Sequence, residues 1–158
     1  MPALTVQAFA TCILMAANTY HVPAAVMIGV MQVEGGHVGQ EAGPNINGTY
    51  DLGPMQVNTR WVPELARMWK VDDRTARAWI RDDGCVNVHV AAWILRHKMD
   101  DTGSLFGGIA AYHSMTPNLG YSYASKVIAA MDRKGLVQHD GPLYQYHTQT
   151  HYSQIAQR

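Results

Sequence analysis

The chain has 158 residues and a mass of 17.5 kDa, which suits one domain that buries a core without metals or cross-links. Charged residues make up 15% of the sequence, and twelve basic side chains balance twelve acidic ones, so the formal net charge is zero. This balance predicts no binding surface for nucleic acid or for anionic lipid.

The two cysteines, Cys12 and Cys85, stand far apart in the sequence. Neither belongs to a CxxC pair or to a Cys/His ligand spacing, so we expect no metal centre built on them. The residues alone leave two interpretations open, a pair of buried thiols or one disulfide. A disulfide would imply an oxidising compartment.

The first predicted helix covers residues 5–20, with Thr5 as its cap. Its apolar positions at helical spacing are Val6, Phe9, Ala10, Ile13, Leu14 and Ala17. The apolar run lacks a basic flank and is interrupted by Asn18 and Thr19, so it predicts a core helix and no membrane span. If the protein is exported, we expect its leader to be absent from this sequence.

The second predicted helix runs over residues 23–34 and ends on an acid. Pro23 suits a first helical position, and Gly35-Gly36 suits the backbone beyond a helix end. Glu34 is the first charged residue of the sequence and follows a largely apolar run. The helix dipole and the apolar neighbours both disfavour the ionised form of Glu34, so we expect a raised pKa, as a general acid needs.

The remaining sequence predicts a mainly α fold interrupted by one polar loop. Residues 37–51 are rich in Gly, Asn, Pro and Thr, which predicts a surface loop. A small hairpin is expected only between Gly48 and Val57. Further helices are expected at 60–70 after a Thr59 cap, from Asp72 or Asp73 to 80, at 85–99, from Ser104, and at 118–133.

Residues 1–134 are assigned to one domain and residues 135–158 to a polar tail without an apolar face. His147 and His151 in this tail have the spacing of helical metal ligands, but a solvated pair is favoured because no acidic partner stands nearby. Three tryptophans are interpreted as core side chains in preference to platforms that stack on sugar rings: Trp61, Trp69 and Trp93.

Four short motifs occur in a fixed order: VEGG, GTYDLGPMQVN, IAAYH and YSYASKV. This series resembles the motifs of the lytic transglycosylases with the goose-lysozyme-like fold, the SLT domain, over roughly residues 8–132. The resemblance implies a mainly α, lysozyme-like fold with a small loop or hairpin next to the active-site cleft. It also implies cleavage of the MurNAc-GlcNAc β-1,4 bond in peptidoglycan glycan strands, with neither a metal nor an organic cofactor.

In that family the Glu of the first motif is the sole essential acid and base, so the resemblance assigns this role to Glu34. The acid would protonate the oxygen leaving MurNAc C1 and then activate the MurNAc 6-hydroxyl, which gives a 1,6-anhydro product. Gln56 matches a Gln that helps to line the glycan subsites. Met55 beside it is expected at the edge of the cleft.

Two tyrosines also match the family by resemblance. Tyr112 corresponds to the tyrosine beside the catalytic acid, and Tyr123 corresponds to the late tyrosine of the final helix. His113 stands where the family has Asn and is counted among the substrate-binding residues. Gly35 replaces the usual Ser after the acid, and Pro54 replaces the usual Leu. These departures motivate an alternative function, a weakly active wall-binding assembly factor.

Asp51 leaves a further alternative open. It follows Glu34 by seventeen residues, a spacing similar to that between the two acids of the animal c-type lysozymes. A second carboxylate would stabilise a cation or act as nucleophile, which makes the protein a hydrolytic muramidase. The other interpretation is that Asp51 caps a turn and binds backbone amides.

A narrower resemblance is to the specialised transglycosylases encoded with type IV secretion, conjugation, pilus and type III secretion systems. It is carried by Cys12, Val22-Pro23, the block from Asn45 to Asn58, Cys85-Val86-Asn87, and Ala91 to Leu95. In that subgroup the two cysteines pair. The resemblance therefore implies a Cys12–Cys85 disulfide, a periplasmic location, and local wall opening for a secretion or conjugation apparatus.

Overall fold

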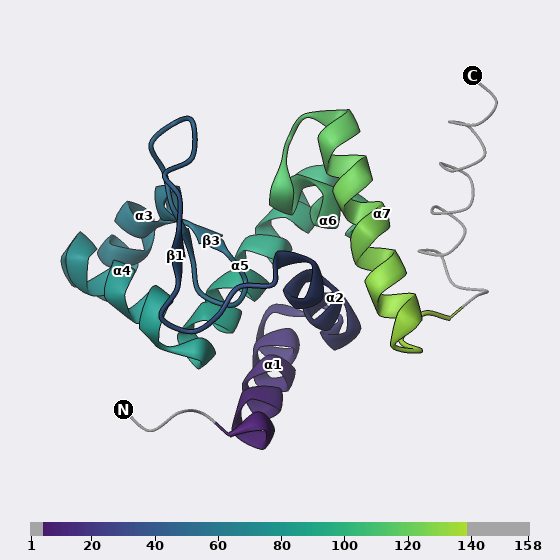
Figure 1. Cartoon of the computed structure of the whole chain (residues 1–158), viewed down its shortest axis with the longest axis horizontal. Helices are drawn as coiled ribbons and strands as arrows, with labels where there is room; N and C mark the ends of the chain where they lie inside the picture. Colours follow the sequence, from purple (N-terminus) through teal and green to yellow (C-terminus); the bar gives the residue numbers. More distant parts are fainter. Residues whose placement is uncertain (1–4, 139–158) are drawn as a thin grey trace. The chain divides into compact units, whose positions relative to one another are not determined.

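A computed structural model describes residues 5–138 of the chain, and these residues fold mainly into helices (Figure 1). The mainly α class predicted from the sequence is therefore confirmed. In chain order the elements are α1 (Val6–Tyr20), α2 (Ala24–Glu34), β1 (Glu41–Ala42), β2 (Asp51–Leu52), β3 (Val57–Asn58), the 3-10 turn η1 (Thr59–Trp61), α3 (Val62–Trp69), α4 (Asp73–Asp82), α5 (Gly84–Thr102), α6 (Leu105–His113) and α7 (Pro117–Arg133).

The described residues form two compact units, and each unit combines two separate stretches of chain. Residues 5–21 and 34–93 make the first unit, which holds α1, the three strands, α3, α4 and the first half of α5. Residues 22–33 and 94–138 make the second unit, which holds most of α2, the end of α5, α6 and α7. The predicted tail lies largely outside the described residues, as do His147 and His151.

Side-chain caps begin several helices where the sequence predicts them. The Thr5 hydroxyl accepts the Ala8 N–H, and the Asp72 carboxylate accepts the Thr75 N–H at 2.8 Å. Ser104 caps α6 in the same way. The cap predicted at Thr59 is displaced by one residue, because the Asn58 side chain accepts the Arg60 N–H and Thr59 is already inside η1. Local polar chemistry thus sets these helix starts.

Helix α1 buries a narrower face than its apolar pattern predicts. Ile13, Ala16 and Ala17 are buried, whereas Val6 and Leu14 are 84% and 61% exposed. The buried positions recur at the three- and four-residue spacing of one helix face. Small alanines on that face let α1 pack closely within its unit.

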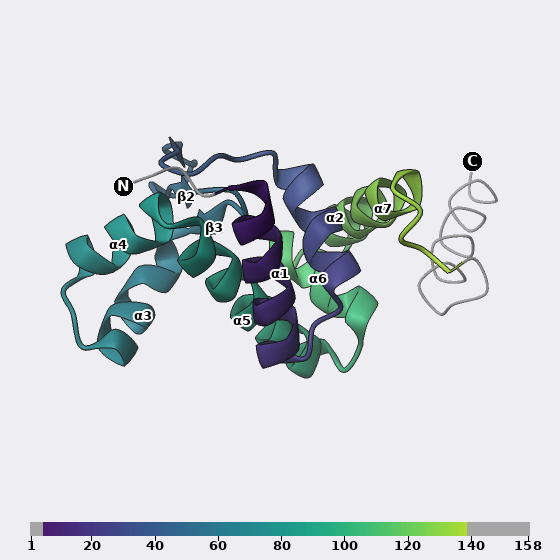
Figure 2. The same cartoon turned by 90° about the horizontal axis from the view of Figure 1, so that it is seen from below.

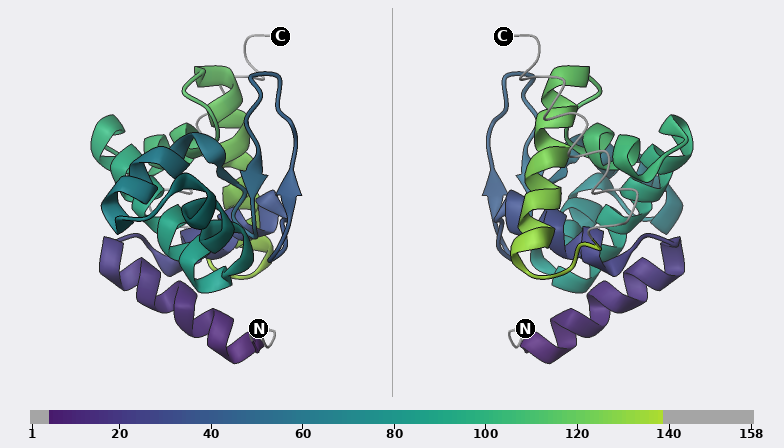
Figure 3. Two further views of the ribbon diagram at one scale, coloured as in Figure 1. Left: turned by 90° about the vertical axis from the view of Figure 1, so that its left-hand side faces the viewer. Right: turned by 90° about the vertical axis from the view of Figure 1, so that its right-hand side faces the viewer.

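The three strands form a short antiparallel sheet in the order β1-β2-β3. Ala42 pairs with Asp51, and Leu52 pairs with Val57, so β2 is the central strand. The connection between β1 and β2 extends from the sheet as a long hairpin (Figures 1 and 3). The hairpin therefore begins earlier than predicted, because its first strand lies at Glu41 and not beyond Gly48.

In the second unit, small residues allow close helix packing. A Cβ added at Gly29 would lie 2.6 Å from Met131 Cγ, so α2 touches α7 at this point, and Figure 2 shows the two helices side by side. A Cβ at Gly108 would lie 2.9 Å from the Met99 backbone, which brings α6 onto the end of α5. The glycine at position 108 thus allows α6 to lie close to α5. Within residues 5–138, no helix combines the length and apolar character that a bilayer span requires.

Candidate active site

Glu34 is the last residue of α2 and is half-buried. The next residue, Gly35, adopts a left-handed φ of 62°, a conformation that glycine takes without steric cost. The Gly-Gly pair therefore ends the helix where the sequence predicts. It also fixes the direction in which the chain leaves the carboxylate.

Gly36 packs directly against the turn formed by residues 53–56. A Cβ added at Gly36 would lie 2.1 Å from the Gly53 carbonyl oxygen and 2.5 Å from Gln56 Nε2. Only a glycine fits this space, because real Cβ atoms do not approach so closely. The structure thus brings the segment that follows Glu34 into contact with the turn that carries Gln56.

Gln56 is held in an uncommon backbone conformation. Its φ is 48°, although it is not a glycine. Its backbone N–H and its side-chain Nε2 both donate to the Gly53 carbonyl, at 3.1 and 2.9 Å. These two bonds restrict the rotamer of the half-buried carboxamide. The turn therefore presents Gln56 as a preorganised polar group.

Asn87 on α5 lies behind this turn and is fully buried. Its Oδ1 accepts the Met55 N–H at 2.8 Å, and its Nδ2 donates to the carbonyls of Leu52 and Ile80 at 2.8 and 2.9 Å. A Cβ at Gly53 would lie 2.5 Å from Nδ2, so Gly53 has no room for a side chain. The sequence did not predict this role of Asn87. The one indication was the presence of a carboxamide side chain in the apolar start of α5, which favours a buried hydrogen-bonding group.

Asp51 is engaged on both carboxylate oxygens by side-chain amides. Asn58 Nδ2 donates to Oδ1 at 2.9 Å, and Asn45 Nδ2 donates to Oδ2 at 3.0 Å. The same two amides also donate to the Thr49 hydroxyl, at 2.9 and 3.1 Å. These contacts cross-link the hairpin and β3. The donors in these contacts are side-chain amides, whereas the interpretation of Asp51 as a turn cap expects backbone amides.

The sheet is fastened to α4 by an ion cluster that sequence reasoning did not anticipate. Glu41 on β1 pairs with Arg77 and lies 3.7 Å from Arg81. The Arg77 guanidinium also lies over the Tyr50 ring, 5.0 Å from its centroid. Arg81 in turn hydrogen-bonds Asp82, and this bond holds the pKa of the Asp82 carboxyl below its ordinary value. The cluster anchors the strand that leads into the hairpin.

A disulfide joins Cys12 on α1 to Cys85 on α5, with Cα atoms 5.2 Å apart. Both residues belong to the first unit. The Asp83 carboxylate accepts the N–H groups of Cys85 and Val86, so the start of α5 is capped beside the bridge. The implied pairing is therefore confirmed, and it lies two residues from Asn87.

The predicted site residues that follow Gln56 in the chain are aromatic and belong to the second unit: Tyr112, His113 and Tyr123. Tyr112 is half-buried on α6, and His113 is the exposed last residue of that helix. Tyr123 on α7 is only 5% exposed. The His113 and Tyr123 rings stack with centroids 4.7 Å apart and an interplanar angle of 5°. The structure thus brings two of these predicted residues together.

Met55 is fully buried, which differs from the cleft-edge position expected for its side chain. It sits in the turn that Asn87 clamps, so its side chain faces the core while its N–H is bonded. The tryptophans form two partly buried pairs. Trp61 meets Trp93 edge-on at 5.5 Å between centroids, and Trp69 lies 5.8 Å from Trp79.

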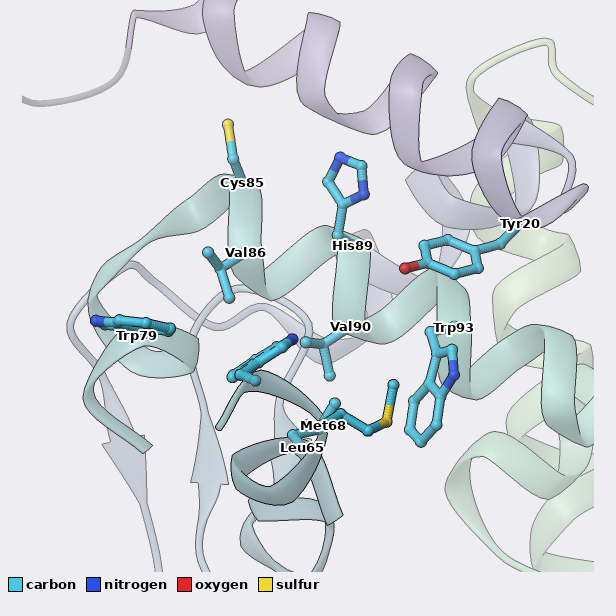
Figure 4. A pocket seen from close by; sticks show the side chains of 10 residues that line it. Tyr20, Leu65, Met68, Trp79, Cys85, Val86, His89, Val90 and Trp93 are labelled. Atoms are coloured by element: carbon cyan, nitrogen blue, oxygen red, sulfur yellow. The ribbon is translucent and has the colours of Figure 1, made fainter. Parts of the chain in front are cut away.

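A separate pocket of about 490 Å³ opens among α1, α3, α4 and α5 (Figure 4). It is lined mainly by aromatic and aliphatic side chains, including Tyr20, Met68, Trp79, His89 and Trp93. None of the residues that the resemblance assigns to catalysis or substrate binding lines it. Among residues 5–138, no group of three or more His, Cys, Asp or Glu side chains is arranged to hold a metal ion.

The helix that ends on Glu34 and the glycine packed on the Gln56 turn thus belong to a mainly α fold of the lysozyme-like class. The Transglycosylase SLT domain model matches residues 11–126, which include Glu34, Gln56 and Tyr123. A search of curated proteins found no match to the chain. Because the family model covers well over half of the sequence, the chain belongs to the Transglycosylase SLT domain family.

Proposed function

We propose that this protein is a peptidoglycan lytic transglycosylase that uses Glu34 as its single acid and base. The observation that carries the proposal is the packing of the segment after Glu34 on the turn of Gln56, which is so close that a Cβ added at Gly36 would lie 2.1 Å from the Gly53 carbonyl oxygen. Membership of the SLT domain family supports peptidoglycan as the substrate. The half-buried position of Glu34 at the C-terminal end of α2, next to the Gln56 turn, supports its assignment as the acid.

The proposed reaction has two proton transfers through one carboxyl group. Glu34 gives its proton to the glycosidic oxygen as the bond to MurNAc C1 breaks, and the substrate N-acetyl group stabilises the developing cation. The carboxylate then takes the proton of the MurNAc 6-hydroxyl as O6 bonds to C1. The products are a free GlcNAc 4-hydroxyl and a 1,6-anhydro end, and Glu34 is again protonated. No water is added.

Product chemistry tests this function. Purified cell wall is digested, and the fragments are analysed by mass spectrometry for anhydro and reducing ends. Glu34→Gln keeps the shape of the side chain but removes the acid, so cleavage should fall by at least about 100-fold. Glu64→Gln on α3 changes an acid of the same type away from the Gln56 turn and serves as the control. Equal cleavage by wild type and Glu34→Gln would refute the role of Glu34.

Hydrolysis with Asp51 as second carboxylate is the competing enzyme function. Both Asp51 oxygens already accept amide hydrogen bonds within the hairpin, which favours a bracing role. Reducing ends without anhydro product would favour the muramidase instead. Binding of wall fragments without cleavage by the wild type would favour the third function, a wall-binding assembly factor.

We also propose that the protein acts in the periplasm, where it opens the wall for a secretion or conjugation apparatus. Support comes from the Cys12–Cys85 disulfide and from the hairpin block 45–58, whose Asn, Asp and Thr side chains bond to one another. Cell fractionation tests the location. Complementation of a deletion strain with wild type and with Glu34→Gln tests the role: equal restoration of substrate transfer by both would overturn it.

A further inference from the structure

We propose that Asn87 is a positioning residue for the cleavage reaction, because its buried carboxamide clamps the turn that carries Gln56 and supports the segment after Glu34. The inference rests on the proposed function, since it assigns a role within that site. It concerns a residue whose carboxamide bonds backbone groups of the turn and of α4. Its effect is transmitted through backbone groups of the turn.

Both N–H donors and the oxygen of the Asn87 amide group are engaged in hydrogen bonds. Its two N–H donors go to the Leu52 and Ile80 carbonyls, and its oxygen accepts from Met55 N–H. The side chain is completely buried, so water does not replace these bonds. Removing the carboxamide would leave buried backbone groups without partners, which is costly and favours displacement of the turn.

The clamp holds both sides of the turn. Leu52 immediately precedes Gly53, and Met55 immediately precedes Gln56. Asn87 therefore fixes the two peptide groups that enclose Gly53 and Pro54. Gly53 in turn supplies the carbonyl that accepts both N–H groups of Gln56. A shift of the clamped peptides would move that carbonyl and with it the Gln56 side chain.

The same shift would reach the segment after the acid. Gly36 lies against the Gly53 carbonyl and the Gln56 amide with no spare space. Any movement of the turn toward Gly36 would therefore displace the backbone two residues from Glu34. Asn87 thus acts on the acid and on the subsite residue through one rigid element. The bond to Ile80 is separate, because it ties α5 to the end of α4 and serves stability alone.

The experiment compares Asn87→Ala with Val88→Ala. Val88 is the next residue of α5 and is also fully buried, so its truncation lowers stability without touching the clamp. Initial rates are measured at a temperature where far-UV circular dichroism shows both variants folded. For Asn87→Ala we expect kcat to fall at least about tenfold, and for Val88→Ala it should stay within about twofold of wild type. Equal rate losses in both variants would overturn the inference.

A second arm asks whether the effect passes through Gln56. In a Gln56→Ala background, Asn87→Ala should cost a smaller factor of activity than it costs in the wild type, because one of the two groups being positioned is already missing. The same full loss in both backgrounds would mean that Asn87 does not act through Gln56, and it would contradict the proposal. If Asn87→Ala does not fold, Asn87→Asp takes its place, since it keeps the size of the side chain and the acceptor for Met55.

A third readout does not need activity. The Gln56 side-chain amide signals in a ¹H–¹⁵N NMR spectrum should shift in the Asn87 variant and stay in place in Val88→Ala. If the wild type cleaves no wall, the proposed function fails while these signals still decide the positioning role. Unshifted Gln56 signals in the Asn87 variant would overturn the inference even for an active enzyme.

Discussion

The imidazole ring of His113 lies parallel to the phenol ring of Tyr123, at 4.7 Å between centroids and 5° between planes. His113 ends α6, and Tyr123 is almost fully buried on α7, so the stack joins the two helices at an exposed edge. The lytic transglycosylases that the sequence resembles have Asn at the position that matches His113. In this chain the aromatic face of the imidazole therefore supplies a packing contact that an amide does not make.

Replacing His113 with Asn should lower the free energy of unfolding by about 0.5–1.5 kcal/mol, the usual contribution of an aromatic pair. Urea unfolding followed by far-UV circular dichroism measures this change. His37→Asn, which alters an exposed histidine in the loop after α2, is the control and should be nearly neutral. An equal effect of both variants would show that the stack contributes no stability.

Two adjacent glycines after the acid should respond differently to alanine. Gly35→Ala introduces a Cβ into open space but at φ 62°, so it should cost about 1–2 kcal/mol of stability and little activity. Gly36→Ala drives a Cβ into the Gly53 carbonyl and the Gln56 amide, so wall cleavage should fall at least about tenfold. Stability and cleavage are measured on the same samples. Full activity of Gly36→Ala would contradict the close packing.

Substitution of Asp51 by Asn separates a brace from a second catalytic carboxylate. The substitution replaces one accepting oxygen by an NH2 donor, which would face the donating amide of Asn45 or Asn58. One hydrogen bond is then lost, so the free energy of unfolding should fall by about 1–3 kcal/mol. Cleavage should persist at a temperature where the variant is folded, and the anhydro product should be unchanged. Mass spectrometry of the digest checks the product. Loss of activity comparable to that of Glu34→Gln would favour the two-acid mechanism.

Reduction of the Cys12–Cys85 disulfide should destabilise the first unit substantially. The two cysteines are 73 residues apart, and a bridge that closes a loop of this length lowers the entropy of the unfolded chain by an amount worth about 4 kcal/mol. Denaturant unfolding with and without reductant measures the difference. Cys12→Ser/Cys85→Ser should behave like the reduced wild type, and reductant should then have no further effect.

The cap of α4 should make stability depend on acid pH. The N–H and the hydroxyl of Thr75 bond the Asp72 carboxylate and hold its pKa below the ordinary value of 3.8. A carboxyl whose pKa is lower in the folded state stabilises the fold above its unfolded pKa, and that contribution is lost as the pH falls through the folded pKa. Asp72→Asn keeps a capping oxygen but does not titrate. The stability difference between wild type and Asp72→Asn should therefore shrink on acidification from about pH 6 to below about pH 3.

Short-range chemistry explains which features the sequence predicts well. The apolar run before Glu34 and the Gly-Gly pair after it indicate a helix end, and Asp72 and Ser104 indicate helix starts. The motif order indicates the SLT domain, and the family match agrees with that resemblance. These signals lie within a few residues of the feature that they predict.

Contacts between distant residues explain what the sequence analysis missed. Strand β1 pairs with β2, and its Glu41 is held by Arg77 of α4, thirty-six positions further along the chain. The partners of Asn87 lie thirty-two and thirty-five residues upstream of it, at Met55 and Leu52. The burial of Met55 follows from the same clamp. No local pattern carries such information, because a lone Asn in an apolar helix has no periodic signature.

The positions of the tryptophans make intrinsic fluorescence a probe of one unit of the protein. All four tryptophans of the sequence, Trp61, Trp69, Trp79 and Trp93, belong to the first unit, together with Glu34 and Gln56. Fluorescence excited at the red edge of protein absorption therefore reports on that unit alone, whereas circular dichroism averages over both. A denaturation experiment that records the two signals together measures whether the halves of the protein melt as one cooperative body or in sequence.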